Sequence, residues 1–144
     1  MKFWDASAIL PLCFKESHTR AIEQLIVEDE AMVAWWGSLV ECYSALERLR
    51  REGSLDFLSE GQASHILKAL ASGWTEVEPT NEVRQIARRL LRLHPLRAAD
   101  SLQLAAALIW AEKNPFNHGF VCLDERLREA AKNEGFFIYP SNVS

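Results

Sequence analysis

Apolar residues gather along the chain in two patterns: short continuous runs, and sets spaced for one side of a helix. The continuous runs are short enough to be strands, and several end at an Asp or a Pro, which are rare inside strands. They lie at residues 2–4, 31–35, 74–77, 119–123 and 136–139. We expect a strand at each of them.

The helically spaced sets lie between these runs. In residues 19–29, Ile22, Leu25 and Ile26 follow the i, i+3, i+4 spacing of an amphipathic helix. Pro95 separates two further segments of this kind, since proline does not continue a helix. The predicted helices are residues 6–14, 19–29, 38–51, 56–72, 81–93, 97–113 and 125–133.

For two of these helices we also predict a capping residue or the apolar positions. Ser7 is the expected N-cap of the first helix, because a hydroxyl can accept a hydrogen bond from an N–H of the first turn. In the helix at 56–72, the expected apolar positions are Phe57, Ile66, Leu67 and Leu70.

Strands and helices alternate along the chain. This order is typical of an α/β sandwich with a mostly parallel central sheet flanked by helices. The chain has 144 residues and no repeat, linker or low-complexity segment, which fits the size of one compact domain. We therefore expect a single domain over residues 1–144.

Composition and charge narrow the class of protein. With 49% hydrophobic and 25% charged residues, the chain is neither disordered nor collagen-like. The net charge of −4 provides no overall basic field, so a nucleic acid would have to be held by local patches. No uncharged run, Leu102–Ala111 included, approaches the ~20 residues of a membrane span. We expect a cytoplasmic protein without a signal peptide or membrane contact.

The cysteines and histidines show no metal-ligand spacing. Each of Cys13, Cys42 and Cys122 lies in an apolar run, which predicts buried free thiols in a reducing compartment. Four scattered histidines are expected to be solvated or structural: His18, His65, His94 and His118.

Four acidic residues lie where parallel α/β folds build their sites. Asp5 and Asp124 each follow a predicted strand, while Glu41 and Asp100 lie near the starts of predicted helices. Sites in such folds form outside the carboxyl ends of the strands, and helix starts lie on that same edge. We therefore expect the four carboxylates to converge on one edge of the sheet.

Each acid also has a purely structural interpretation. Glu41 follows Ser38 at the spacing of a capping box. Asp124 fits the N-cap of the next helix, and Asp100 fits a favourable charge at a helix start or a partner of Arg97. These interpretations explain the acids singly, but they do not explain four acids on one edge.

Four neighbouring carboxylates have a chemical consequence. Two of them ~4 Å apart repel by ~1 kcal/mol in water and ~4 kcal/mol at an effective dielectric constant near 20. Such a group raises the pKa values of its members or requires a cation, and oxygen ligands favour Mg²⁺ or Mn²⁺. The sequence has no Ser-His-Asp or Cys-His order, no Walker A loop and no GxGxxG. Metal-assisted phosphodiester hydrolysis is the chemistry that this pattern favours.

The order and spacing of these acidic residues along the chain resemble those of the PIN domain family. The resemblance rests on Asp5-Ala-Ser7, Glu41, Leu96-Arg-Ala-Ala-Asp100 and Leu123-Asp124-Glu-Arg-Leu127. It covers essentially the whole chain, and it extends to the stand-alone prokaryotic members, the VapC-type toxins of type II toxin–antitoxin pairs. No single motif is specific, whereas the ordered set of four acids is.

The resemblance implies a PIN-like three-layer sandwich and an endoribonuclease that uses one or two Mg²⁺ or Mn²⁺ ions and is held inactive by a cognate antitoxin. The implied catalytic metal ligands, direct or through water, are Asp5, Glu41, Asp100 and Asp124. Ser7 would steady Asp5 or a metal-bound water. Many members carry another acid shortly after the last aspartate; here Glu125 is adjacent, and we leave it out of the set. We also expect a homodimer.

An RNA substrate requires positive charge near the acids. Arg84, Arg88 and Arg92 form one stripe on a predicted helix, with Arg97 just beyond it, and they are the candidate RNA-binding residues; a solvated helix face is the alternative. Trp35 and Trp36 end a predicted strand, where we expect burial, with an aromatic wall of a dimer or antitoxin groove as the alternative.

Two other functions stay open at this level. One is a PIN-like nuclease of RNA processing that has no antitoxin, which the absence of a neighbouring antitoxin gene would indicate. The other is a non-catalytic interaction module that keeps the fold. The presence of all four mutually repelling acids argues against this module, since a site without activity would not need them.

Overall fold

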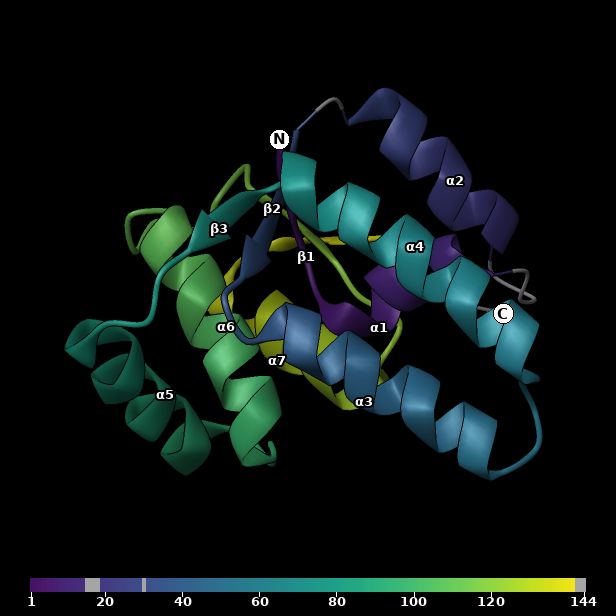
Figure 1. Ribbon diagram of the computed structural model, residues 1–144. Helices are drawn as coiled ribbons and strands as arrows, with labels where there is room; N and C mark the ends of the chain where they lie inside the picture. Colours follow the sequence, from purple (N-terminus) through teal and green to yellow (C-terminus); the bar gives the residue numbers. More distant parts are fainter. Residues whose placement is uncertain (15–18, 30, 142–144) are drawn as a thin grey trace.

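A parallel sheet forms the centre of the computed structural model, which describes residues 1–14, 19–29 and 31–141 (Figure 1). His18 lies outside these residues. In the described part of the chain the sheet has five strands in the order β3-β2-β1-β4-β5, and every neighbouring pair is parallel. The strands are β1 (Lys2–Trp4), β2 (Met32–Trp35), β3 (Thr75–Val77), β4 (Gly119–Val121) and β5 (Phe137–Tyr139). The predicted α/β fold with a mostly parallel sheet is confirmed.

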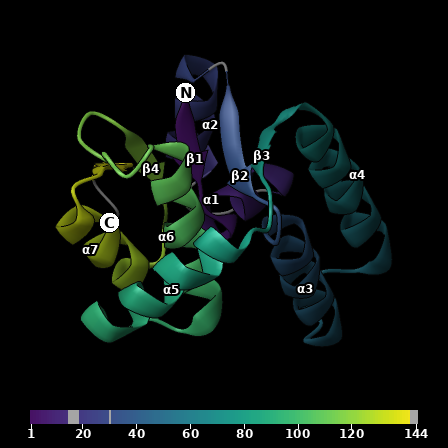
Figure 2. The ribbon, with the colours of Figure 1, turned by 90° about the vertical axis from the view of Figure 1, so that its left-hand side faces the viewer.

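Helices cover both faces of this sheet and make three layers (Figures 1 and 2). One face carries α1 (Ala6–Ile9), a 3-10 helix (Leu10–Cys13), α2 (Thr19–Glu28), α3 (Ser38–Arg51) and α4 (Phe57–Gly73). The other carries α5 (Asn81–Leu93), α6 (Ala98–Trp110) and α7 (Glu125–Glu134). The three central strands β1, β2 and β4 are therefore buried on both sides, which explains why they appear as continuous apolar runs, whereas the edge strands β3 and β5 are partly exposed.

The order of the strands places a natural site beside β1. Phe3 of β1 pairs with Val33 of β2 on one side and with Phe120 of β4 on the other. The chain moves outward from β1 through β2 and β3, then returns to β4 and β5, so the order reverses between β1 and β4. Ligands of open parallel sheets bind at the carboxyl ends of the strands at such a reversal. Asp5 and Asp124 lie beyond the ends of these two strands.

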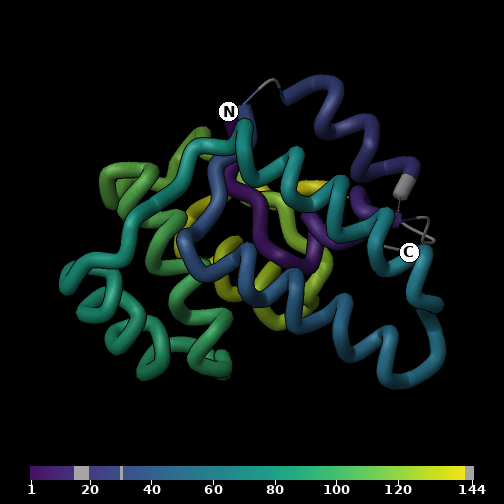
Figure 3. Tube along the Cα trace, viewed as in Figure 1, coloured from purple at the N-terminus to yellow at the C-terminus, as the bar shows by residue number. Residues whose placement is uncertain are grey.

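The first helical segment differs from its prediction in its cap. Asp5, rather than Ser7, is the N-cap of α1: the Asp5 side chain accepts a hydrogen bond from the Ser7 backbone N–H. The α-helix lasts four residues and then tightens into the 3-10 helix, with Pro11 in its first turn. Figure 3 shows this purple segment beside the teal tube of α4, against which the 3-10 helix packs. Proline has no N–H to continue an i→i−4 ladder, and short 3-10 turns often follow such an interruption.

The predicted apolar side of α4 is partly wrong. Leu67 is buried and Leu70 is partly buried, but Phe57 is 83% exposed and Ile66 is 39% exposed. A helix turns by 100° per residue, so Phe57 lies about 80° away from Leu67 around the axis, and Ile66 lies about 100° away. Ala63, one turn before Leu67, contributes to the buried face instead.

Several smaller expectations can also be compared with the structure. Trp35 is buried as expected, but Trp36 is 53% exposed. The helix predicted to reach residue 113 ends at Trp110, since Glu112 and Lys113 adopt positive φ values that leave the helix. The three cysteines are buried and free, as predicted. No helix in residues 1–14, 19–29 or 31–141 has the length and apolar character that spanning a membrane requires.

Candidate active site

The ends of β1 and β4 bring the first candidate acid against the last strand segment before Asp124. The Asp5 backbone N–H donates to the Val121 carbonyl at 2.9 Å, which continues the β1–β4 ladder by one residue. The Asp5 side chain then turns into the molecule and is only 4% exposed. This aspartate therefore lies beneath the carboxyl edge of the sheet rather than in open solvent.

Neutral donors hold the Asp5 carboxylate. Its Oδ2 accepts from the Ser7 hydroxyl at 2.5 Å, from the Ser7 N–H at 3.1 Å and from the Cys122 thiol at 3.4 Å. The Ser7 hydroxyl in turn accepts from the Leu123 N–H at 2.9 Å, which ties it to the segment after β4. Ser7 thus makes the contacts that a residue steadying Asp5 requires.

Burial dominates the protonation of Asp5. Loss of water around the carboxylate raises its pKa to about 6, although the hydrogen bonds from Ser7 and Cys122 act in the opposite direction. The negative charge of Asp100 raises it further. A positive charge brought next to Asp5 would reverse this effect.

Glu41 lies in the first turn of α3, but the capping-box interpretation is wrong. The N-cap of α3 is Gly37, and Ser38 is already the first helical residue. The Ser38 hydroxyl donates to Oε1 of Gln103 at 3.2 Å instead of capping its own helix. Gln103 Nε2 in turn donates to the Glu41 carboxylate.

The Glu41 carboxylate shares the electrostatic situation of Asp5. Burial raises the pKa of Glu41 to about 7, and the charges of Asp5 and Asp100 add to this increase. The hydrogen bond from Gln103 lowers the pKa in part. Asp5, which is buried, and Glu41, which is partly buried, therefore form a pair of acids that disfavour each other's charge.

Asp100 and Asp124 form the more open part of the site. Burial raises the pKa of Asp100, the charge of Asp124 raises it further, and the charges of Arg97 and Arg126 lower it. Asp124 is the N-cap of α7, as its structural interpretation predicted: its Oδ1 accepts from the N–H groups of Arg126 and Leu127 at 3.0 and 3.5 Å. Capping does not remove Asp124 from the site, because its charge still acts on Asp100.

Mutual repulsion thus links all four expected carboxylates: Asp5, Glu41, Asp100 and Asp124. We call this group the acidic edge. Within the described residues, no three His, Cys, Asp or Glu side chains converge closely enough to hold an ion in their present positions. The donor set nevertheless fits Mg²⁺ or Mn²⁺, because it consists of oxygen ligands and its repulsion is relieved by a cation. Water molecules would then complete the contacts to the ion.

Of the predicted arginines, Arg97 lies nearest the acidic edge, as its effect on Asp100 shows. Arg84 donates to Asn81 on its own helix, while Arg88 and Arg92 line a shallow hollow on α5 together with Arg89. Neither the hydrogen bond of Arg84 nor the hollow lined by Arg88 and Arg92 involves one of the four acids. They stay candidates for more distant RNA contacts.

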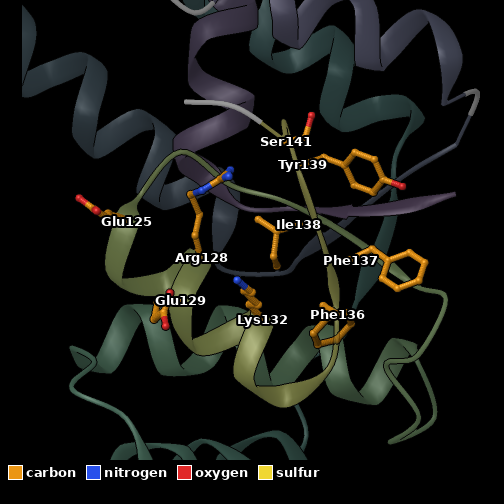
Figure 4. A pocket seen from close by; sticks show the side chains of 9 residues that line it. All are labelled: Glu125, Arg128, Glu129, Lys132, Phe136, Phe137, Ile138, Tyr139 and Ser141. Carbon is orange, nitrogen blue, oxygen red and sulfur yellow. The ribbon is translucent and has the colours of Figure 1, made fainter. Parts of the chain in front are cut away.

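Glu125, which follows Asp124, is the first residue of α7. It lines a hollow between α7 and β5, shown in Figure 4, together with residues such as Arg128 and Lys132. Arg128 in that wall donates to the carbonyls of Cys122 and Pro140, both at 2.8 Å. This arginine therefore fixes the segment that leads from β4 to Asp124.

Sequence reasoning missed three residues at this site: Gln103, Cys122 and Arg126. Gln103 had a detectable signal, since it is the one polar side chain in the apolar run Leu102–Ala111 and lies three residues after Asp100. Cys122 was expected to be buried, but nothing in its spacing indicated a contact with Asp5. Arg126 follows Asp124 by two residues and acts on Asp100 across the edge.

Comparison with known proteins supplies the family. The profile of the PIN domain matches residues 2–133. The chain belongs to the PIN domain family. This family consists of nucleases, and the match extends over all four acids of the acidic edge. No curated protein matches the chain in sequence.

Solved structures share this PIN fold at low sequence identity. VapC20 of Mycobacterium tuberculosis, a toxin that cleaves the sarcin–ricin loop, aligns with a TM-score of 0.65 at 14% identity, over 95% of this chain and 97% of that one. FitAcB of Neisseria gonorrhoeae aligns with a TM-score of 0.64 at 12% identity, over 96% of both chains. At these identities the likeness establishes the three-layer fold.

Proposed function

We propose that this chain is a metal-dependent endoribonuclease and the toxin of a type II toxin–antitoxin pair. The acidic edge carries the proposal: four carboxylates lie at the strand reversal of a PIN fold, and burial raises the pKa values of three of them, Asp5, Glu41 and Asp100. The activity of VapC20, which shares the fold, supports a toxin that acts on RNA.

The proposed cofactor is Mg²⁺ or Mn²⁺, as one or two ions, with the four carboxylates as catalytic ligands directly or through water. When bound, a divalent ion supplies positive charge for the scissile phosphate and lowers the pKa of the attacking water. Ser7 keeps the Asp5 carboxylate in one orientation, because its hydroxyl and its N–H both donate to Oδ2. Burial makes the charged form of Asp5 and, to a lesser extent, of Glu41 unfavourable in the absence of a cation, so binding of a cation there would be favoured.

RNA would approach the open part of the acidic edge. Arg97 is the first candidate for contact with the RNA backbone, and Arg126 is a second, since the charges of both act on Asp100. The α5 arginines Arg84, Arg88 and Arg92 extend this positive charge away from the site. Because the net charge of the chain is −4, such local patches have to supply the attraction to RNA.

The toxin assignment also implies partners. We propose a cognate antitoxin that blocks the acidic edge, a homodimer, a cytoplasmic location, and one PIN domain over residues 1–144. A neighbouring gene for a small protein that suppresses cleavage would distinguish the toxin from an RNA-processing nuclease without an antitoxin. Co-purification would detect the complex with the antitoxin, and light scattering would measure the mass of the homodimer.

Cleavage of a mixed RNA pool tests the proposed activity. Purified protein is incubated with Mg²⁺, with Mn²⁺ or with EDTA, beside the Asp5→Asn variant as a matched control that keeps the size of the side chain. The proposal predicts metal-dependent cutting that EDTA and the substitution both abolish. Absence of cutting together with absence of any metal response in the wild type would favour the non-catalytic interaction module.

A further inference from the structure

Gln103 is a buried polar residue that the four-acid pattern does not explain. It lies on α6, in contact with α3, and its side chain is completely buried. A buried amide without hydrogen bonds is destabilising, so a site of this kind favours an apolar residue unless the amide has partners. The neighbours of Gln103 in the sequence, Leu102 and Leu104, are apolar.

The partners of Gln103 all lie on α3. Its Nε2 is 2.9 Å from the Ser38 hydroxyl, which also approaches Oε1 at 3.2 Å. The same Nε2 donates to Oε2 of Glu41. Through these bonds, Gln103 joins the first turn of α3 to the first half of α6.

Gln103 also lies on the side of α6 that carries a second candidate ligand. It follows Asp100 by three residues, and residues at this spacing lie on one face of a helix. The amide therefore holds Glu41 against the same face of α6 from which Asp100 extends. This contact therefore sets the separation between Glu41 and Asp100.

We propose that Gln103 is a positioning residue for the divalent ion, which holds the Glu41 carboxylate in place beside Asp100. This inference rests on the proposed function, since it requires the acidic edge to bind the ion. A neutral amide suits this role: it donates to one carboxylate oxygen, Oε2, and leaves Oε1 for the ion or its water. A lysine or arginine there would orient Glu41 as well, but its positive charge would repel the ion.

The test is the affinity for Mn²⁺, measured by calorimetry on the full chain without RNA. The main variant is Gln103→Met, which keeps the length of the side chain and removes its donors. Loss of a residue that orients a metal ligand typically weakens metal binding 10- to 100-fold, and we expect a loss of about 10-fold or more. Ser101→Ala is the matched control on α6, because the Ser101 hydroxyl donates to Ala98 of its own helix; it should leave Mn²⁺ affinity unchanged.

A double-mutant cycle separates positioning from general damage. If Gln103 acts through Glu41, Gln103→Met should leave Mn²⁺ affinity unchanged in a Glu41→Gln background. An equal loss in both backgrounds would overturn the proposal. If Gln103→Met does not fold, Ser38→Ala replaces it: this variant loosens Gln103 without touching Glu41 and should weaken Mn²⁺ binding by about threefold.

The remaining outcomes distinguish this inference from the proposed function. Wild-type affinity in both folded variants, Gln103→Met and Ser38→Ala, would overturn the role of Gln103 and leave the metal site intact. Failure of the wild type itself to bind Mn²⁺ would overturn the proposed function and this inference together.

Discussion

The acidic edge consists of two halves that differ in burial and in the groups around the carboxylates. Asp5 and Glu41 form the more buried half: they are held by neutral donors, Ser7 and Gln103, and burial raises their pKa values to about 6 and about 7. Asp100 and Asp124 form the more open half; burial and the charge of Asp124 raise the pKa of Asp100 as well, but the charges of Arg97 and Arg126 offset part of this increase. The comparison indicates that the buried half accumulates negative charge that a cation relieves, while the open half has positive charge available for a polyanion.

The largest expected difference between the halves is in catalysis. Asp5→Asn should reduce RNA cleavage by about 1,000-fold or more, because it removes a buried carboxylate from the proposed ion site. Asp124→Asn should cost less, about 10- to 100-fold, since asparagine still caps α7 and Asp124 lies at the open end. Single-turnover cleavage rates at saturating Mn²⁺ compare the two variants, and equal losses would contradict the division into halves.

The second difference is in the pH dependence of stability without metal. The folded pKa values of Asp5 and Glu41 lie above the unfolded values, so their protonated forms favour the folded state. Their contribution is present below about pH 4 and is lost as the pH rises toward 7, at a cost of a few kcal/mol at most. Urea unfolding from pH 4 to pH 8 in EDTA measures this, with Asp5→Asn and Glu41→Gln as the variants in which the loss should shrink. A wild-type profile identical to that of both variants would contradict the raised pKa values.

The third difference is in stability at neutral pH. In EDTA at pH 7.5, Asp5→Asn should raise the free energy of unfolding by about 1–3 kcal/mol, because the neutral amide avoids burial of a charge. Asp124→Asn should change it by less than about 0.5 kcal/mol, since this residue caps a helix in either form. Denaturant midpoints of the two variants provide the comparison, and a destabilised Asp5→Asn variant would argue against a repulsive buried half.

The smallest expected effect is on RNA affinity. Arg97→Gln should weaken RNA binding by about 3- to 10-fold and reduce its salt dependence, because Arg97 lies beside the open half. Arg84→Gln is the matched control, since Arg84 is engaged with Asn81 on its own helix and should change binding less. Filter binding at several salt concentrations, in EDTA to prevent cleavage, measures both. A larger loss for Arg84→Gln would move the RNA path to α5.

The fold was predictable because the apolar runs of the strands and the helical spacing of apolar residues both indicated the same alternation of strands and helices. The strand runs and helix spacings predicted α3 at residues 38–51 and α5 at residues 81–93, with the same bounds that the structure shows. Asp5 and Asp124 could be placed at one edge because parallel strands end together. These inferences needed only periodicity and the geometry of a parallel sheet.

The failure that concerns the acidic edge came from contacts between distant elements, while others, such as that of Phe57, had local causes. Ser38 and Glu41 have the spacing of a capping box, yet their partner is Gln103, which is more than 60 residues away in the sequence. Phe57 is apolar, but the turn of α4 carries it away from the buried side. Local spacing cannot reveal which neighbouring helix satisfies a polar group, so the support of the acidic edge became visible only in three dimensions.

The central claim is that the acidic edge binds a divalent cation, and a Mn²⁺ titration of thermal stability tests it most directly. In buffer at pH 7.5, the melting temperature of the wild type should rise with Mn²⁺, since a ligand that binds only the folded state stabilises it. The Asp5→Asn variant should start higher in EDTA and show little further rise. A wild-type melting temperature that does not change up to millimolar Mn²⁺ would contradict the account.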